Sequence, residues 1–198
     1  MKKNLNENLN NLRKTIESYA HISDDTWESL VQISTLKRVK KNDCTCRFGD
    51  TARELMFVVQ GLLRAYIVDE EGHEYNKNFF LENSFAGSMV SLLTKEPSYF
   101  EIEALEDSEV IFIDYEKFRE LLVEKDDLKL FQIYYLEKNW LIDKESREVA
   151  LVQKSATERY RDFLIKYPAL EFRVPQYLIA SHLGITPTQL SRIRKSKK

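Results

Sequence analysis

The pattern of hydrophobic and polar positions predicts two short amphipathic helices at the start of the chain. In residues 5–20, hydrophobic side chains recur at three- and four-residue intervals, which would place them on one helix face. These positions are Leu5, Leu9, Leu12 and Ile16. A second helix is expected directly after Ser23, because its hydroxyl suits an N-cap and acidic residues follow in the first turn.

The pattern changes between about residue 37 and residue 114, where short β-branched and aromatic runs alternate with turn residues. The runs are TCRF, LMFVV, LRAYIV, KNFFL, YFEIEAL and EVIFID. Turn signals separate them, for example at Gln60-Gly61 and in the Asp-Glu-Glu-Gly of residues 69–72. Strands at intervals of roughly 8–12 residues are typical of a β-sandwich or barrel.

Helical spacing returns after Asp114, with one helix expected over residues 115–127 and a longer one over residues 127–152. The longer helix carries a wide apolar and aromatic stripe. The residues we expect to mediate dimerisation there are Phe131, Tyr135, Trp140, Ile142 and Val149. Such a stripe indicates a partner helix from a second copy of the chain. The alternative is a long helix that is buried entirely within one chain.

The break at Lys154-Ser155 ends this stripe, and we interpret it as an interdomain hinge before another helix over residues 156–167. The segment VPQYLIASHLGITPTQLSRIRKSKK then follows. Its first helix would end at Gly184, where a tight turn needs positive φ. Thr186 as N-cap, Pro187 at N1 and Gln189 at N3 then form the capping box of a second helix.

A helix, a glycine turn and a capped helix with a polar and basic outer face together indicate a helix-turn-helix. The major groove of DNA accepts one helix, whose outer side chains contact base edges and phosphates. The expected DNA contacts are Thr186, Pro187, Thr188, Gln189, Ser191, Arg192, Arg194 and Lys195. Arg192 suits a guanine, whereas Ser191, Arg194 and Lys195 suit phosphates. The alternative is a helix pair with no nucleic-acid role.

Charge favours the DNA interpretation once it is divided along the chain. The whole chain has a net charge of −2. Residues 153–198 contain ten Lys or Arg and three acids, a net charge of +7, which leaves −9 for residues 1–152. An acidic body joined to a small basic module is typical of nucleic-acid binders, and a solvated basic tail is the alternative.

Composition excludes several other classes of protein. The 5 glycines form no phosphate-binding loop, and the 3 histidines are too scattered for an HExxH zinc site. Two cysteines, Cys44 and Cys46, cannot supply a disulfide framework or a four-thiolate cluster. No apolar run approaches the roughly 18–20 residues of a membrane span. We therefore expect a soluble cytoplasmic protein with no enzymatic activity, no metal, no cofactor and no membrane partner.

These features together resemble the Crp/Fnr family of bacterial transcription regulators over nearly the whole chain. Phe48-Gly49-Asp50 followed by MFVVQGLLRAYIVDEEGHE is similar to the opening strands of the family, and LGITPTQLSRI is similar to its recognition motif. The resemblance places Arg192 at the base-reading arginine. It implies an α+β fold: an N-terminal antiparallel β-roll of the double-stranded β-helix or jelly-roll type, a long dimerisation helix and a C-terminal helix-turn-helix.

The effector pocket implied by the resemblance departs from the cyclic-nucleotide pattern. Its residues would be Gly87, Ser88, Met89, Ser98 and Tyr99. The family's ribose-binding glutamate is replaced by Ser88, and its phosphate-binding Arg-Ser or Arg-Thr pair by Ser98-Tyr99. The positions that would reach the adenine, Lys144 and Glu145, do not match either. A buried phosphate without a cation is costly, so we expect that cAMP does not bind by the usual contacts.

Two further departures concern the cysteines and the DNA module. Cys44 and Cys46 are expected to be ordinary half-buried residues of a strand, and His73 a surface residue near a hairpin turn. Only EFRV precedes Pro175 where many relatives have a β-hairpin, and we expect the phosphate contacts of a winged segment to be missing. We expect the basic RKSKK segment to substitute for some of the phosphate contacts of a wing.

The sequence thus predicts a homodimeric, sequence-specific DNA-binding transcription regulator of the Crp/Fnr type. Residues 1–120 would form the sensor, residues 121–153 the dimerisation helix and residues 154–198 the DNA-binding domain. The expected partners are double-stranded DNA, a second copy of the chain, RNA polymerase and an unknown small effector other than cAMP. One alternative is a cupin-like β-roll module with no DNA role, although His73 is the only histidine in the predicted barrel. Another is a regulator that has lost its ligand response.

Overall fold

A computed structural model describes residues 2–196, and side chains from residue 7 onward. Leu5, Lys197 and Lys198, which the sequence analysis used, therefore lie outside the described side chains. The chain divides into two compact units. The first unit comprises Met1–Ala65 and Phe79–Lys138, and the second comprises Tyr66–Asn78 and Asn139–Lys198. The expected division at residues 120 and 153 stays a prediction.

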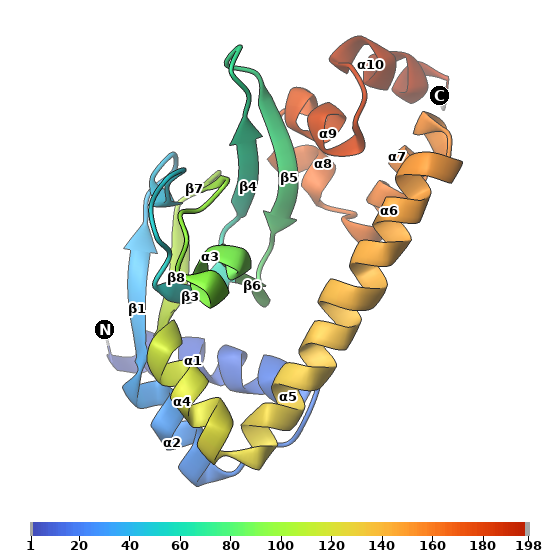
Figure 1. Ribbon diagram of the computed structural model, residues 1–198. Coiled ribbons are helices and arrows are strands. Elements are labelled where there is room, and N and C mark those ends of the chain that lie inside the picture. The colour runs from blue at the N-terminus through green and yellow to red at the C-terminus, as the bar shows by residue number, and fades with distance from the viewer. Residues whose placement is uncertain (1, 197–198) are drawn as a thin grey trace. The chain divides into compact units, whose positions relative to one another are not determined.

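The strands form two four-stranded sheets with the orders β1-β8-β3-β6 and β2-β7-β4-β5 (Figure 1). The strands are β1 (Ser34–Val39), β2 (Cys44–Cys46), β3 (Glu54–Gln60), β4 (Leu63–Val68), β5 (Glu74–Phe80), β6 (Ser84–Ala86), β7 (Glu101–Ala104) and β8 (Ser108–Asp114). In the first sheet, β3 and β8 are antiparallel and their register runs from Glu54 opposite Asp114 to Gln60 opposite Glu109. The expected β-roll and the α+β class are confirmed.

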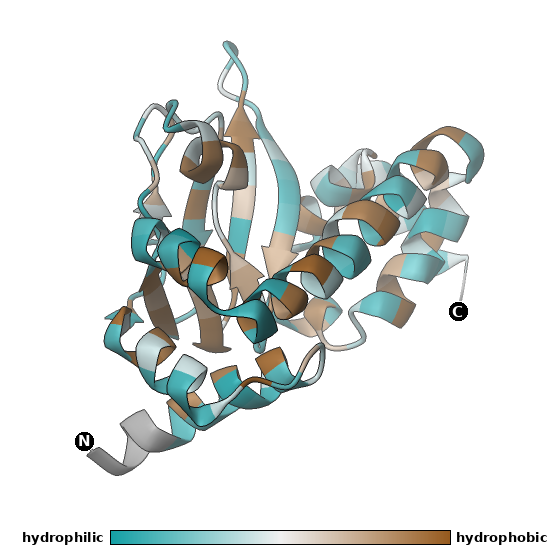
Figure 2. Cartoon of the chain, turned by 60° about the horizontal axis from the view of Figure 1, so that its bottom comes forward, coloured by the Kyte–Doolittle hydropathy of each residue, from teal (hydrophilic) through white to brown (hydrophobic). Residues whose placement is uncertain are grey.

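Two hydrophobic clusters fill the first unit. One gathers Leu12, Phe57, Phe85, Ile111 and Phe118, and other residues from the helices and the first sheet. The other lies between the sheets and includes Val58 and Ile102, both with 0% exposure. Figure 2 shows hydrophobic residues concentrated in the strands, whereas hydrophobic and polar residues alternate around the helices. This distribution is expected for helices that bury one face.

A glycine permits the close approach of β8 to the turn after β3. Gly61 has a φ of +99°, which L side chains rarely adopt. A Cβ built on Gly61 would lie 2.2 Å from the hydroxyl oxygen of Ser108. The Ser108 hydroxyl also accepts a hydrogen bond from the backbone N–H of Leu62. A side chain at position 61 would therefore displace β8.

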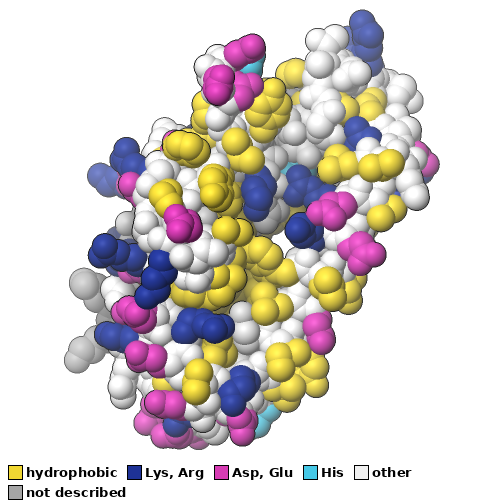
Figure 3. All heavy atoms as spheres, viewed as in Figure 1, with side chains coloured by type: hydrophobic (Ala, Val, Ile, Leu, Met, Phe, Trp, Pro, Cys, Tyr) yellow, Lys and Arg dark blue, Asp and Glu magenta, His cyan; other side chains and the backbone are white. Residues whose placement is uncertain are grey.

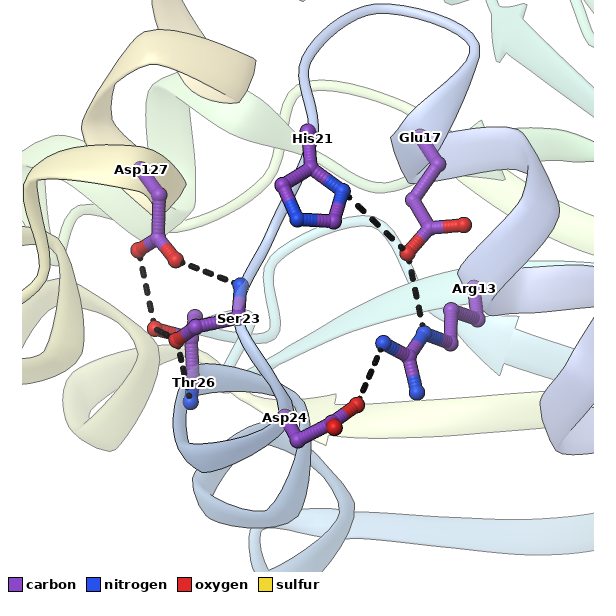
Figure 4. A network of polar contacts seen from close by, with 7 residues as sticks. All are labelled: Arg13, Glu17, His21, Ser23, Asp24, Thr26 and Asp127. Carbon is purple, nitrogen blue, oxygen red and sulfur yellow. Dashed lines mark hydrogen bonds and ion pairs between the residues drawn. The ribbon is translucent and has the colours of Figure 1, made fainter.

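The helices of the first unit are α1 (Lys2–Glu17), α2 (Asp24–Gln32), α3 (Met89–Thr94), α4 (Tyr115–Glu124) and α5 (Asp126–Leu136). A polar network joins α1, α2 and α5 (Figure 4). The Asp127 carboxylate accepts hydrogen bonds from Ser23 N and Thr26 Oγ1, each at 2.8 Å. Burial would raise the pKa of Asp127, but these bonds lower it below its usual value. Ser23 is also the N-cap of α2, as the sequence predicted.

The predicted long helix over residues 127–152 is continuous but not uniform. A π-helical segment, η1 (Glu137–Ile142), separates α5 from α6 (Asp143–Gln153). Phe131 is 2% exposed and packs against Tyr19 and Phe85 of the first unit. The expectation that Phe131 contacts a partner chain is therefore corrected, because its ring belongs to the chain's own core.

The second unit contains the remaining helices and the tip of the β4–β5 hairpin. The helices after α6 are α7 (Ala156–Lys166), α8 (Leu170–Arg173), α9 (Gln176–Leu183) and α10 (Pro187–Lys195). The Ser155 hydroxyl caps α7 in a capping box with Glu158, so the helical chain breaks at Lys154-Ser155 as expected. Within the described residues, no helix combines the length and apolar character needed to cross a membrane.

Candidate nucleic-acid interface

The turn between α9 and α10 has the geometry that the sequence predicted. Gly184 ends α9 in the left-handed conformation with a φ of +66°. The N–H of Ile185 then donates to the carbonyl of Ala180 at 3.0 Å, which satisfies one of the last carbonyls of α9. Leu178, Ile179 and Leu183 are buried, but Tyr177 is 54% exposed and does not join the buried face of α9. The turn therefore fixes how the chain leaves α9.

The first turn of α10 is closed by a reciprocal capping box. The Thr186 hydroxyl accepts a hydrogen bond from Gln189 N at 3.1 Å, and the Gln189 side-chain oxygen accepts one from Thr186 N at 2.9 Å. Pro187 occupies the start of the helix, where its missing N–H has no cost. These contacts confirm the predicted capping residues. The carboxamide oxygen of Gln189 is engaged by the cap, which leaves its NH₂ group for other contacts.

The two faces of α10 differ in burial and in chemistry. Leu190 is fully buried and Ile193 is half-buried, so these residues hold the helix against its own unit. Thr188, Arg192 and Lys195 are exposed, and their spacing of four and three residues places them on one face. This face combines a hydroxyl, a guanidinium and an ammonium group. Those are the groups that bind base edges and phosphates in a major groove.

Arg194 lies on a different face from the one the DNA interpretation requires. One of its guanidinium nitrogens lies 2.8 Å from the carboxylate of Glu171 in α8. The Tyr160 hydroxyl of α7 donates to the same carboxylate oxygen at 2.8 Å. Burial and this hydrogen bond raise the pKa of Tyr160 to about 12. Arg194 therefore connects α10 to α7 and α8, and its guanidinium is engaged by Glu171 instead of lying beside Arg192.

Ser191 is half-buried and lies at the edge of the exposed face of α10. It lines a shallow hollow of about 370 Å³ together with Arg194 and Lys195 of α10 and Tyr160 and Glu171 of the supporting helices. Sequence spacing could not separate Arg194 from Thr188 and Arg192. The signal that would do so is the acidic partner Glu171, which lies 23 positions before Arg194 in the chain.

The residues of the expected effector pocket are brought together only in part. The Ser98 hydroxyl donates to the Ser88 hydroxyl at 2.8 Å, and both residues are buried. Met89 belongs to the hydrophobic core, whereas Tyr99 is 65% exposed. The two serines thus satisfy one another at the positions where the resemblance implied a glutamate and an arginine.

A small cavity of about 210 Å³ adjoins Ser88 in the first unit. It contains one cation, Arg53, which the sequence analysis missed, and two acids, Asp50 and Glu54. Pockets for small-molecule ligands usually measure about 300–1,000 Å³. The cavity is therefore small, and one of its two acids, Glu54, is paired with Lys37 at 3.0 Å.

Both cysteines are half-buried thiols of β2 with raised pKa values. Burial and a hydrogen bond to Glu101 raise the pKa of Cys44 to about 11, and burial raises the pKa of Cys46. Thiols, unlike thiolates, are poor nucleophiles and poor metal ligands. His73 is exposed and bonded to Asp69 at the hairpin tip, as expected for a surface residue.

Comparison with known proteins agrees with this architecture. Residues 36–125 match the cyclic nucleotide-binding domain. The chain is 28% identical over 166 residues to the transcriptional activator protein FnrA of Stutzerimonas stutzeri, covering 78% of this chain and 67% of that protein. It is 27% identical over 184 residues to the fumarate and nitrate reduction regulatory protein of Vibrio cholerae, covering 87% of this chain and 72% of that one.

Among solved structures, the c-di-GMP-responsive global regulator CLP of Xanthomonas campestris matches with a TM-score of 0.69 and 20% identity. The match covers 88% of this chain and 91% of that one. A β-roll sensor-type domain with a C-terminal helix-turn-helix defines a class of two-part regulators. Over most of its length the chain is similar to transcription regulators of that class, which supports its assignment to the Crp/Fnr family.

The capping box of α10 gives a direct stability test. We expect Thr186→Ala to reduce the free energy of unfolding of the second unit by about 1 kcal/mol, because the N–H of Gln189 loses its partner. Thr188→Ala changes the same residue type two positions further along the chain, at an exposed position outside the cap, and should change stability by less than about 0.5 kcal/mol. Denaturant unfolding followed by circular dichroism measures both, and equal effects would contradict the assigned cap.

Proposed function

We propose that the chain acts as a homodimer that reads a palindromic DNA site with α10. The observation that carries this proposal is the exposed face of Thr188, Arg192 and Lys195 on a helix whose first turn is closed by its own cap. Because the first turn of α10 is already ordered, the helix can enter a DNA groove with its outer side chains without any change in its backbone. Its contacts therefore cost little conformational entropy.

Each residue of this face has a distinct role in the proposal. Arg192 can donate two parallel hydrogen bonds to O6 and N7 of a guanine. Thr188 and Pro187 contact base edges or a thymine methyl, and the NH₂ group of Gln189 is available to bases or backbone. Lys195 neutralises a phosphate. The N–H of Thr188 in the first turn of α10 and the partly exposed hydroxyl of Ser191 supply further phosphate contacts.

Substitution of the two exposed cations separates base reading from phosphate binding. Arg192→Ala should cost about 1–3 kcal/mol on the preferred site and relax the base preference at one symmetric pair of positions. Lys195→Ala should weaken binding to all sequences alike and reduce the salt slope by about one unit. Fluorescence anisotropy with matched and single-substituted duplexes at several salt concentrations measures both quantities.

Arg119→Ala serves as the control, because Arg119 is an exposed arginine on α4 in the other unit. It should leave affinity and base preference unchanged. If Arg192→Ala keeps full base preference while Lys195→Ala abolishes it, α10 is rotated relative to the orientation proposed here.

The proposed dimer uses the helical segment of α5, η1 and α6. Side chains classed as hydrophobic follow this segment at the molecular surface (Figure 3). Those with large exposed fractions include Leu141 at 63%, Ile142 at 60% and Val152 at 87%. Of the expected dimer residues, Trp140, Ile142 and Val149 are exposed, whereas Tyr135 is half-buried against Phe131. An apolar surface of this kind on one helix favours a second copy of the same helix.

Charge placed on this surface should separate the two chains. We expect Ile142→Glu combined with Val149→Glu to raise the dimer dissociation constant at least about 100-fold, because the interface would have to bury unpaired carboxylates. Sedimentation equilibrium measures the change. Val123→Glu on α4, where Val123 is 75% exposed, is the matched control and should leave the dimer intact. A dimer that survives the double substitution would place the interface elsewhere.

We also propose that the cassette around Ser88 and Ser98 does not bind cAMP by the contacts that the resemblance implied. The two serines are bonded to each other, and the adjacent cavity is small and holds two acids against one arginine. A phosphate placed there would meet neither a buried cation nor free donors.

Calorimetry of the full chain with millimolar cAMP should therefore show no saturable heat. Ser98→Arg, which restores a cation at this position, is the informative variant, and any gain of binding in it supports the interpretation of the cassette. Saturable micromolar binding to the unchanged chain would contradict that interpretation. Arg53→Ala would then show whether Arg53 holds the phosphate.

The remaining partners follow from the DNA-reading role. A regulator that binds promoter DNA acts where the chromosome is transcribed, so we place the chain in the cytoplasm with RNA polymerase as a further partner. The alternative of a β-roll module without a DNA role does not account for α10, which is capped and exposes a cationic face. The relatives are transcription regulators rather than enzymes.

A further inference from the structure

The β4–β5 hairpin is attached to α9 within the second unit. The Ser181 hydroxyl of α9 accepts a hydrogen bond from Asn76 N at 2.8 Å and donates one to Glu74 O at 3.1 Å. Both backbone groups belong to β5, which lies at the edge of its sheet and has no neighbouring strand on its outer side. A side chain of α9 thus satisfies groups that a further strand would otherwise bind.

A second helix holds the same strand. The guanidinium of Arg147 in α6 donates to the carbonyl of Lys77 at 2.5 Å and lies 3.4 Å from Nδ1 of His182 in α9. All of these residues belong to the second unit, and β5 continues into the first unit at Phe79. The first half of β5 is therefore bonded to the helices that precede α10, while its second half belongs to the sheet.

One buried group opposes this attachment. Asn76 is 3% exposed, and neither the oxygen nor the nitrogen of its carboxamide has a hydrogen-bond partner among the described residues. A buried polar group without a partner costs free energy that it would recover in water. Separation of β5 from α9 would break the two bonds of Ser181 but would allow the carboxamide to be hydrated. Opposing contributions of this kind are typical of elements that open and close locally.

The attached hairpin brings negative charge close to the proposed DNA-reading helices. Residues 69–74 contain four acids and no Lys or Arg. Because the carbonyl of Glu74 is bonded to Ser181, the acids at 69–71 lie within about 18 Å of α9 even if the chain between them is fully extended. At low ionic strength the Debye length reaches about 30 Å, so these carboxylates repel the phosphates of a duplex bound at the helix pair.

We propose that the attachment of β5 to α9 is an autoinhibitory contact, which holds the acidic hairpin beside the DNA-reading helices and raises the affinity for DNA when it opens. The inference rests on the proposed role of α10. Ser181 keeps the contact closed through its two hydrogen bonds, whereas the buried carboxamide of Asn76 favours the open state. Substitutions of these two residues therefore shift one equilibrium in opposite directions.

Hydrogen exchange of the full chain, followed by mass spectrometry of residues 66–78 and 176–183, measures how often the contact opens. Ser181→Ala should quicken exchange in both segments several-fold, because two backbone groups of β5 lose their partner. Asn76→Leu, which replaces the carboxamide by an apolar group of similar branching, should slow it several-fold. Ser29→Ala is the matched control, since this hydroxyl donates to a carbonyl of its own helix in the first unit, and it should change neither segment.

Fluorescence anisotropy with matched and random duplexes at low salt tests the inhibition itself. Ser181→Ala should bind DNA several-fold more tightly and Asn76→Leu several-fold more weakly than the unchanged chain, with the same base preference. Glu70→Gln combined with Glu71→Gln neutralises two exposed acids of the hairpin. This double variant should also bind more tightly, by a factor that falls as the salt concentration rises.

The inference is overturned if the two substitutions do not move hydrogen exchange in opposite directions, or if DNA affinity does not follow the exchange. It is also overturned if the variant with two neutralised acids binds no more tightly than the unchanged chain. Each of these results leaves intact a chain that binds DNA and prefers certain bases, so the proposed role of α10 would stand. Absence of DNA binding by every variant would contradict that role, and the inference with it.

Discussion

The orientation of α10 depends on how the first turn of this helix is satisfied. The first backbone N–H groups of any helix lack partners within the helix. Here the Thr186 hydroxyl satisfies the N–H of Gln189, and the Gln189 side chain satisfies the N–H of Thr186 in return. This box follows directly after Gly184, which turns the chain in a conformation that other residues rarely adopt. The rotation of α10 about its axis is fixed by two further contacts. Leu190 is buried against the rest of the second unit, and Arg194 pairs with Glu171 of α8. The face that remains exposed carries the groups proposed to read DNA.

The residues of the expected effector cassette are occupied by their own polar contacts. The hydroxyls of Ser88 and Ser98 are bonded to each other, and the adjoining cavity is lined by two acids and one arginine. Within the second unit, other contacts join β5 to the helices. The Ser181 hydroxyl of α9 bonds the N–H of Asn76 and the carbonyl of Glu74, and Arg147 of α6 donates to the carbonyl of Lys77.

Local signals in the sequence predicted the elements that local interactions determine. The strand runs, the Ser23 cap, the positive φ at Gly184 and the capping box at Thr186 all depend on residues within a few positions of each other. The family resemblance added the order of the domains and the identity of the cassette. Together they were sufficient for the fold class and for most of the outer face of α10.

Contacts between distant residues could not be predicted in this way. The periodicity that placed Phe131 on a dimer stripe also fits a core position, and only the rings of Tyr19 and Phe85 show which one it occupies. The spacing of Arg194 along the helix fits a phosphate contact, and only its ion pair with Glu171 shows that the side chain is engaged within the chain. The contact between the hairpin and Ser181 joins residues more than 100 positions apart and leaves no local pattern.

Selection of bound duplexes from a random DNA pool by the full chain tests most directly whether α10 is a reading helix. A two-fold dimer carrying this helix on each chain should enrich a palindrome whose half-sites lie about one helical turn apart, near 10 bp or 34 Å. A guanine should be fixed in each half-site where Arg192 contacts it. Recovery of the pool without enrichment, or of an asymmetric site that Arg192→Ala still selects, would contradict the assignment of α10.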